Sequence, residues 1–133
     1  MRIASRKFSD WPAEARRVLL ALTMRGGSMR YEVQDETRTW VAFEKKEIVG
    51  WGIASQYYDH GKVAMVYVRR NKRRQGIGAA LLRGIRRDTR RRLYAIPHDV
   101  ASFKFFEGLK VPTSPVRTKD IRYKILLGKI KEK

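Results

Sequence analysis

The stretch that decides the fold runs from Val66 to Leu81 and reads VYVRRNKRRQGIGAAL. An apolar strand pattern ends at Val68, a basic loop follows, and two glycines, Gly76 and Gly78, open a helical pattern. Glycine lets the backbone turn sharply and approach a ligand closely. The N–H groups of the first helical turn have no acceptor inside the helix, and the helix dipole favours a phosphate there. The stretch therefore predicts a phosphate site between a strand and a helix.

Two common phosphate-binding patterns do not fit this turn. The chain has no Gly-x-x-x-x-Gly-Lys followed by Ser or Thr, which a P-loop needs. A dinucleotide-binding turn needs Gly-x-Gly-x-x-Gly, and Leu81 occupies the third glycine position. The pattern that fits is Arg or Gln, two residues, Gly, one residue, then Gly or Ala, which Arg73, Gly76 and Gly78 meet. In this pattern and its strand–helix context the stretch resembles the pyrophosphate loop of the GNAT acetyltransferases, although Arg70 stands where that family often has a proline.

A second, weaker resemblance lies downstream, between Asp99 and Val111. The family places an Asn before a helix that runs into a Phe-Tyr or Leu-Tyr pair and then a Gly-Phe. Aligned on that pair, Phe105 matches and Phe106 replaces the Tyr. Asp99 replaces the Asn, and Lys110-Val111 replaces Gly-Phe. In the resembling family, this Tyr often lies near the coenzyme sulfur and can protonate the thiolate that leaves during acyl transfer. Phenylalanine has the ring but no hydroxyl to donate a proton. Either another group would protonate the thiolate, or the thiolate would leave unprotonated.

The hydrophobic pattern predicts an α/β fold with a mixed sheet, in the order β-α-β-β-β-α-β-α-β. The expected strands are 1–7, 39–44, 47–55, 63–68, 93–96 and 121–127. Three helices are expected. The first is capped by Ser9 or Asp10, has Pro12 in its first turn and is stopped by Gly26-Gly27; the others span 77 to about 92 and 99–109. The strand, helix and strand between Val63 and Ile96 predict a parallel pair with a right-handed crossover. This order of elements also matches the GNAT fold.

The composition fits one domain over residues 1–133, with 43% hydrophobic residues available for a core. The chain has no cysteine, which excludes disulfides, thiolate metal sites and a cysteine nucleophile. Its two histidines, His60 and His98, cannot build a zinc site without carboxylate ligands, so no metal is expected. No apolar run could span a bilayer, and the N-terminus lacks the apolar segment of a signal peptide. The sequence therefore predicts a soluble, cytoplasmic protein.

The charge is strongly basic and uneven. The chain has 31 Lys and Arg against 13 Asp and Glu, for a net charge of +18. From Arg69 to Arg92 there are eleven basic residues and one acid, Asp88. Such density favours a polyanion, whether nucleic acid, an acidic protein or a phosphate-bearing ligand. Five arginines lie off the apolar stripe of the expected helix and form a candidate surface for nucleic acid or an acidic protein: Arg83, Arg86, Arg87, Arg90 and Arg91.

The family resemblance implies acetyl-CoA, or another acyl-CoA, as cosubstrate and a primary amine as acceptor. It implies that the coenzyme pyrophosphate lies on the N–H groups from Gln75 to Ala79, and that the pantetheine arm lies along the strand edge from Val66 to Val68. The implied coenzyme residues are Val66, Val68, Arg73, Arg74, Gln75, Gly76, Ile77, Gly78, Ala79 and Phe106. The amine would attack the thioester directly, without a covalent enzyme intermediate, so that positioning supplies much of the rate.

Four side chains are candidates for moving protons: Asp59, His60, Tyr67 and Tyr94. Asp59 and His60 precede the central strand and could face its open end as a base, or they form only a polar turn. Tyr67 and Tyr94 lie on the strands that would flank the reaction centre, where aromatic residues are usually core. The remaining candidates are interpreted as surface, capping or packing residues: Glu44, Glu47, His98, Trp40 and Trp51.

Two functions remain open from the sequence. The first is an acyl-CoA-dependent N-acyltransferase whose acceptor amine belongs to an anionic macromolecule such as an acidic protein or an aminoacyl-tRNA, because a basic surface repels polyamines and lysine-rich tails. The second is a GNAT-like binding protein without catalysis, which would engage nucleic acid or a protein partner through the arginine surface. Gly76 and Gly78 favour the enzyme, whereas Phe106 and the lack of a clear base favour the binding protein.

Overall fold

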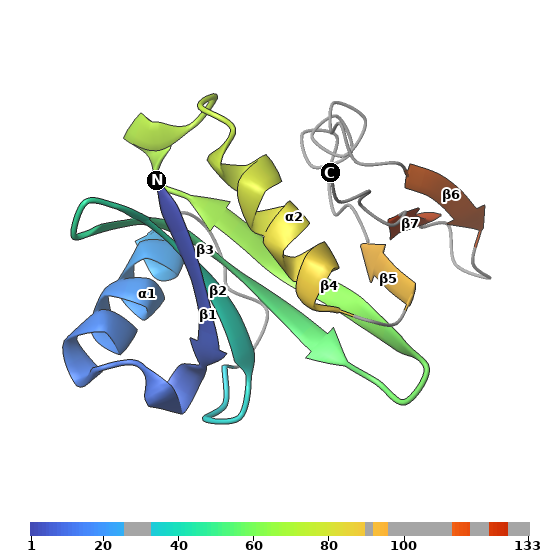
Figure 1. Cartoon of the computed structure of the whole chain (residues 1–133), viewed down its shortest axis with the longest axis horizontal. Helices are drawn as coiled ribbons and strands as arrows, with labels where there is room; N and C mark the ends of the chain where they lie inside the picture. Colours follow the sequence, from blue (N-terminus) through green and yellow to red (C-terminus); the bar gives the residue numbers. More distant parts are fainter. Residues whose placement is uncertain (26–32, 90–91, 96–112, 118–122, 128–133) are drawn as a thin grey trace.

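The computed structural model describes residues 1–25, 33–89, 92–95, 113–117 and 123–127. The described strands form one sheet with the spatial order β1-β2-β3-β4-β5-β7-β6 (Figure 1). They are β1 (Arg2–Lys7), β2 (Arg38–Glu44), β3 (Glu47–Gln56), β4 (His60–Val68), β5 (Arg92–Ala95), β6 (Thr113–Arg117) and β7 (Tyr123–Leu127). The described helices are α1 (Ala13–Arg25) and α2 (Ile77–Asp88), with short 3-10 turns at η1 (Phe8–Asp10) and η2 (Arg70–Lys72).

The pairing of the strands confirms the predicted mixed sheet. β4 and β5 run parallel, with His60–Val63 beside Arg92–Ala95. The other neighbouring strands are antiparallel. The tight turn between β2 and β3 falls at Lys45-Lys46, as predicted, and Lys45 takes the left-handed backbone conformation with φ 55°.

The two helices cover opposite faces of the sheet. Side chains of successive strand residues alternate between the faces, and on β2 Trp40 packs with Leu81 of α2, whereas Val41 packs with Leu19 of α1. Trp40 and Trp51 are both fully buried, which confirms that they are packing residues. They belong to different clusters, so they lie on opposite faces of the sheet rather than side by side.

Helix α2 ends earlier than the predicted end near Arg92. Its last residue is Asp88, and Thr89 continues with extended backbone angles, φ −97° and ψ 107°. The N–H of Thr89 still donates to the carbonyl oxygen of Ile85 at 3.0 Å, so this residue closes the helix. Threonine is β-branched and helps a helix less than the arginines around it. Arg92, the predicted end of the helix, is instead the first residue of β5.

The start of α1 also differs from the prediction. Ser9 and Asp10, the predicted caps, lie in η1, and the helix begins at Ala13. The carbonyl oxygen of Pro12 accepts a bond from the N–H of Arg16 at 3.0 Å, so Pro12 stands where the chain enters the helix. No helix in the described part of the chain is both long and apolar enough to cross a membrane.

β6 is a strand that the sequence analysis did not predict. It contains Pro115, which has no backbone N–H to donate. A central strand pairs with a neighbour on each side and uses all of its N–H groups, so proline is disfavoured there. β6 is the outermost strand on its side of the sheet and pairs with β7, so a proline is tolerated there. The last strand begins at Tyr123, inside the predicted range 121–127. The helix predicted over 99–109 lies outside the described residues.

Candidate functional site

β4 pairs with β5 along only part of its length. Residues His60–Val63 lie beside β5, whereas the rest of β4 continues past the end of the described β5 to Val68. On its other side this second half pairs with β3 as far as Val68. Among the described strands, none lies beside residues 64–68 on the β5 side (Figure 1). A strand edge without a partner can pair with an extended ligand.

A β-bulge separates the two halves of β4. Ala54 pairs with Val63 and Ile53 pairs with Met65, so Ala64 is the additional residue. Ala64 and Met65 both pack on the α1 side of the sheet, whereas Val63 packs on the α2 side. A bulge bends a strand and increases its local twist. β4 therefore changes direction just where its pairing with β5 ends.

In the open half of β4, alternate residues direct their backbone N–H and C=O groups toward β3 and away from it. A Cβ added to Gly50 of β3 would lie 2.7 Å from the carbonyl oxygen of Tyr67, and the N–H of Arg69 donates to a β3 carbonyl at 2.9 Å. Residues 67 and 69 thus direct their backbone groups toward β3. Because these directions alternate along a strand, Val66 and Val68 direct theirs to the open side.

The glycine turn places unpaired N–H groups beside this edge. Gly76 has φ 81°, a left-handed conformation that favours glycine, and a Cβ there would meet nothing within 4 Å. The first bond of α2 runs from the N–H of Ala80 to the carbonyl oxygen of Gly76 at 3.0 Å. The N–H groups of residues 77–79 therefore have no acceptor inside the helix, and Gly76 supplies no side-chain cap. The side chain of Ile77 is buried in the core, so only its backbone N–H can contact a ligand.

The basic loop before this turn carries five cationic side chains, at Arg69, Arg70, Lys72, Arg73 and Arg74. Arg73 Nε donates to the carbonyl oxygen of Val68 at 3.1 Å, and its Cζ lies 5.6 Å from the centroid of the Tyr67 ring. Arg74 has φ 65° and is exposed. Arg70, Arg73, Arg74 and Gln75 are all exposed, next to the helix N-terminus. The bond from Arg73 thus links the end of β4 to the loop that precedes the glycine turn.

Glu44 and Glu47 were interpreted from sequence as surface charges; Glu47 is exposed and Glu44 is half-buried, and both also contact this loop. Lys72 Nζ lies 2.9 Å from Glu44 Oε2, and Arg69 Nε lies 3.7 Å from Glu47 Oε1. The hydrogen bond with Glu44, and then its negative charge, raise the pKa of Lys72 above its usual value. Glu44 and Lys72 are 28 residues apart, so no local sequence signal could have linked them.

Asp59, His60 and Tyr94 form a cluster at the paired end of β4. His60 Nδ1 lies 2.7 Å from Asp59 Oδ1, and the His60 ring contacts the Tyr94 ring edge-on at 5.6 Å between centroids. From sequence, Asp59 and His60 were interpreted either as a base at the open end of the strand or as a polar turn; in the structure His60 pairs with Arg92, at the end of β4 opposite to Val68. At about 3.3 Å of rise per residue, it lies about 20 Å along β4 from Val66.

Tyr67 is the one proton-carrying candidate that lies on the open half of β4. It is partly buried, and its ring packs with the α1-side cluster. Its backbone neighbours Val66 and Val68 are the residues whose polar groups point to the open side. The structure therefore brings Tyr67, and neither His60 nor Tyr94, together with the candidate coenzyme edge.

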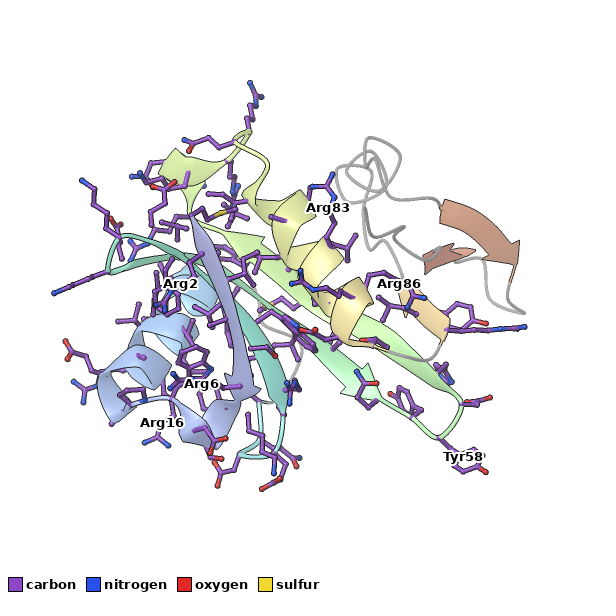
Figure 2. The ribbon with its side chains drawn as sticks, in the orientation of Figure 1. Arg2, Arg6, Arg16, Tyr58, Arg83 and Arg86 are labelled. Carbon is purple, nitrogen blue, oxygen red and sulfur yellow. The ribbon has the colours of Figure 1, made fainter. Side chains whose placement is uncertain are left out.

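The predicted arginine surface on α2 is not continuous, because Arg86 is buried. Only 7% of Arg86 is exposed, and its Nη1 donates to the carbonyl oxygen of Thr89 at 3.0 Å. The guanidinium thus satisfies a carbonyl just beyond the helix end, where cations are also favoured by the dipole. Arg87 is exposed and Arg83 is partly buried, and Figure 2 shows Arg83 and Arg86 on the same helix. Arg90, Arg91 and Phe106 lie outside the described residues.

No cluster of three or more His, Cys, Asp or Glu side chains in the described part of the chain is placed to hold a metal ion. The features that the structure does bring together are an open strand edge, a glycine turn and exposed arginines. These features suit a ligand with an extended polar arm and phosphate groups.

Comparisons with known proteins agree with this arrangement. No curated protein matches the sequence. The Escherichia coli protein ElaA is 11% identical and aligns over 96% of this chain and 99% of its own, with a TM-score of 0.71. An acyl-CoA N-acyltransferase from Pseudomonas aeruginosa is 12% identical over 94% of this chain and 97% of its own, with a TM-score of 0.69.

A third solved structure carries the coenzyme. Diaminobutyrate acetyltransferase EctA from Paenibacillus lautus, in complex with L-2,4-diaminobutyric acid and coenzyme A, is 19% identical. It aligns over 96% of this chain and 95% of its own, with a TM-score of 0.62. At these identities the likeness shows a shared fold. The sequence over residues 2–109 matches the acetyltransferase (GNAT) family, so the chain belongs to the GNAT family of acetyltransferases.

Proposed function

We propose that the protein is an acyl-CoA-dependent N-acyltransferase that transfers an acetyl group from acetyl-CoA to a primary amine. The observation that carries this proposal is the open edge of β4, followed after a short basic loop by the glycine turn that begins α2. One solved structure with the same fold is a complex with coenzyme A, which supports the same ligand here. The open space beside Gly76, where a Cβ would meet nothing within 4 Å, leaves room for a phosphate against the backbone.

The coenzyme phosphates would be held by the turn and the loop together. The N–H groups of residues 77–79 point out of the helix end, where the dipole favours negative charge. Arg73 and Arg74 supply charged donors next to them. The pantetheine arm would pair with the backbone of Val66 and Val68, whose polar groups point to the open side of β4. This arrangement orders the cosubstrate before the amine arrives.

The protein groups near the reacting carbonyl are backbone and Tyr67. An N–H of the open strand edge can donate to the thioester oxygen as negative charge develops there. The phenol of Tyr67 can donate a proton, which Phe106 cannot, so we assign the protonation of the leaving thiolate to Tyr67. The Asp59–His60 pair, about 20 Å along the strand from Val66, would assist the amine only through water or through the acceptor itself.

We infer that the acceptor amine belongs to an anionic macromolecule. The net charge of +18 repels small polyamines and attracts acidic proteins or nucleic acids. An acidic protein and an aminoacyl-tRNA both carry a primary amine on an anionic body. An activity screen with both classes of acceptor distinguishes between them.

The experiment is a coenzyme-binding measurement combined with an activity screen. Coenzyme A should raise the melting temperature, since a ligand of the native state stabilises it. Gly78→Glu would place a side chain and a negative charge at the first turn and should abolish this shift. Release of free thiol from acetyl-CoA should then depend on one amine class among acidic proteins, aminoacyl-tRNA and small amines. Coenzyme binding that persists in Gly78→Glu would contradict the site.

The alternative function, a binding protein that engages nucleic acid through α2, has less support. It needs a continuous basic surface, and Arg86 is 7% exposed and engaged with Thr89. Tight binding of coenzyme A with no turnover on any amine class would favour this alternative over the enzyme.

A further inference from the structure

The hairpin turn between β2 and β3 lies against the basic loop that leads to the glycine turn. We propose that this hairpin positions the coenzyme loop, residues 69–74, and that Glu44 is its principal positioning residue. The proposal rests on the function proposed above, in which this loop faces the coenzyme phosphates. Glu44 and Glu47 would not touch the coenzyme; they would act through Lys72 and Arg69.

The first anchor is Arg69, at the end of β4. Its backbone N–H donates to the carbonyl oxygen of Val49 at 2.9 Å, and its side-chain Nε donates to the carbonyl oxygen of Ile48 at 2.7 Å. The same Nε lies 3.7 Å from Glu47 Oε1. Backbone and side chain of one residue are thus both tied to the start of β3, which fixes where the loop leaves the sheet.

The second anchor is Lys72, in the middle of the loop. Its Nζ lies 2.9 Å from Glu44 Oε2, and both side chains are about two-thirds shielded, with 27% and 32% exposed. The N–H of Lys72 donates to the carbonyl oxygen of Arg69 at 2.9 Å, which closes η2. Because the next residues are Arg73, Arg74 and the turn at Gly76, this contact sets the position of the phosphate-facing groups.

The negative charges of Glu44 and Glu47 distinguish a positioning role from a purely electrostatic effect on coenzyme binding. Glutamates beside the loop repel a polyphosphate, so if charge alone mattered, they would weaken coenzyme binding. They also occupy two of the five cations of the loop, which leaves Arg70, Arg73 and Arg74 for a ligand. A positioning role predicts that removing Glu44 weakens coenzyme binding, whereas a pure charge effect predicts that it strengthens binding. The two accounts therefore differ in sign.

The test compares Glu44→Gln with a matched control, Glu36→Gln. Glu36 Oε2 lies 3.1 Å from Lys7 Nζ, so the control breaks the same type of ion pair and changes the net charge equally. The control pair lies away from the hairpin. Arg2, at one end of β1, pairs with Phe43 near the hairpin, whereas Lys7 is at the other end of β1. Calorimetry with coenzyme A should show about two- to fivefold weaker binding for Glu44→Gln, the range of a solvent-accessible ion pair. The control should bind as wild type or slightly more tightly.

A second readout does not need the coenzyme. Hydrogen exchange of the amides at 69–74 in the unliganded protein should be faster in Glu44→Gln than in wild type and Glu36→Gln. If wild type does not bind coenzyme A but this exchange difference is present, the proposed function fails and the hairpin anchor stands. If Glu44→Gln does not fold, Lys72→Met removes the other side of the pair and should give the same exchange result. Unchanged exchange, or coenzyme binding that is tighter than in the control, overturns the proposal.

Discussion

Gly76→Ala should destabilise the protein through the backbone alone. Gly76 has φ 81°, and a Cβ there would meet nothing within 4 Å, so no steric clash contributes. The left-handed conformation costs an L-residue with a Cβ about 1–2 kcal/mol. For a chain of 133 residues, that corresponds to a melting temperature about 3–10 °C lower. Gly76→Asn should lose less, because asparagine visits the left-handed region more readily than alanine.

The control is Gly84→Ala, in the same helix. A Cβ at Gly84 would lie 3.4 Å from Trp40 Cδ1 and 3.6 Å from Ile3 Cγ2, which are ordinary contacts. Its backbone is helical, so alanine should be neutral or add up to about 1 kcal/mol of stability. Urea denaturation followed by tryptophan fluorescence measures all three variants. If Gly76→Ala is as stable as wild type, or if Gly76→Asn is no better than Gly76→Ala, the turn does not require the positive φ.

Three further predictions follow from side-chain contacts. His60→Gln should lower kcat/KM by less than about tenfold, because His60 lies far from the open edge; a loss of about 10²–10⁴-fold, measured by thiol release, would make it the base. Arg86→Gln should cost about 1–3 kcal/mol in urea denaturation because Arg86 is buried and hydrogen-bonded to Thr89. For Arg87→Gln, at an exposed position, the free energy of unfolding should stay within about 0.5 kcal/mol of wild type. Equal losses of stability in the two variants would contradict a structural role for the buried Arg86. The pKa of Lys72 is raised in the folded state, so its pair with Glu44 stabilises the fold below pH 10.5 and loses this effect as the pH rises above that value. The melting difference between wild type and Lys72→Met should therefore narrow above pH 10.5, and a constant difference would show that the stabilisation is not ionic.

The central part of the fold could be predicted because its signals are local. The hairpin at Lys45-Lys46 is bracketed by two apolar runs, and the end of α1 at Arg25 precedes a glycine pair. The sharp glycine turn was predicted from one motif, and Gly76 makes this turn with a φ of 81°. These features depend on residues within a few positions of one another, so sequence reasoning reaches them.

Of the features that were missed, the burial of Arg86 follows from helical spacing, and the strand β6 and the contact of Glu44 depend on tertiary placement. Pro115 argues against a strand unless the strand is outermost, and only the strand order of the sheet reveals that β6 is. Arg86 was predicted on the outer face of α2, but it follows the buried Leu82 by four residues and lies on the buried face, whereas Arg87 is exposed. The guanidinium of Arg86 contacts the carbonyl of Thr89. Glu44 gains its role from a lysine 28 residues away.

The distribution of charge separates coenzyme binding from acceptor binding. The loop cations that contact neither glutamate are all exposed and shortly precede the glycine turn: Arg70, Arg73 and Arg74. Figure 2 shows Arg2, Arg6 and Arg16 on β1 and α1, on the other side of the sheet from Arg83 of α2. Arg2 and Arg6 each place the guanidinium over an aromatic ring, at 5.0 and 4.8 Å from the centroids of Phe43 and Trp11.

Arg2 pairs with Phe43 near the hairpin and so lies nearer the coenzyme loop, whereas Arg6 pairs with Thr39, farther along β1 from the hairpin. Three strand spacings separate β1 from β4, which is about 14 Å. The coenzyme therefore accounts for the basic loop but not for Arg6 or the basic charge on α1. A small neutral or cationic amine would gain nothing from that charge, whereas an amine carried on an extended anionic body would contact it while its reactive end reaches the open half of β4. The excess of basic residues outside the loop is thus our reason for proposing a macromolecular, anionic acceptor rather than a small free amine.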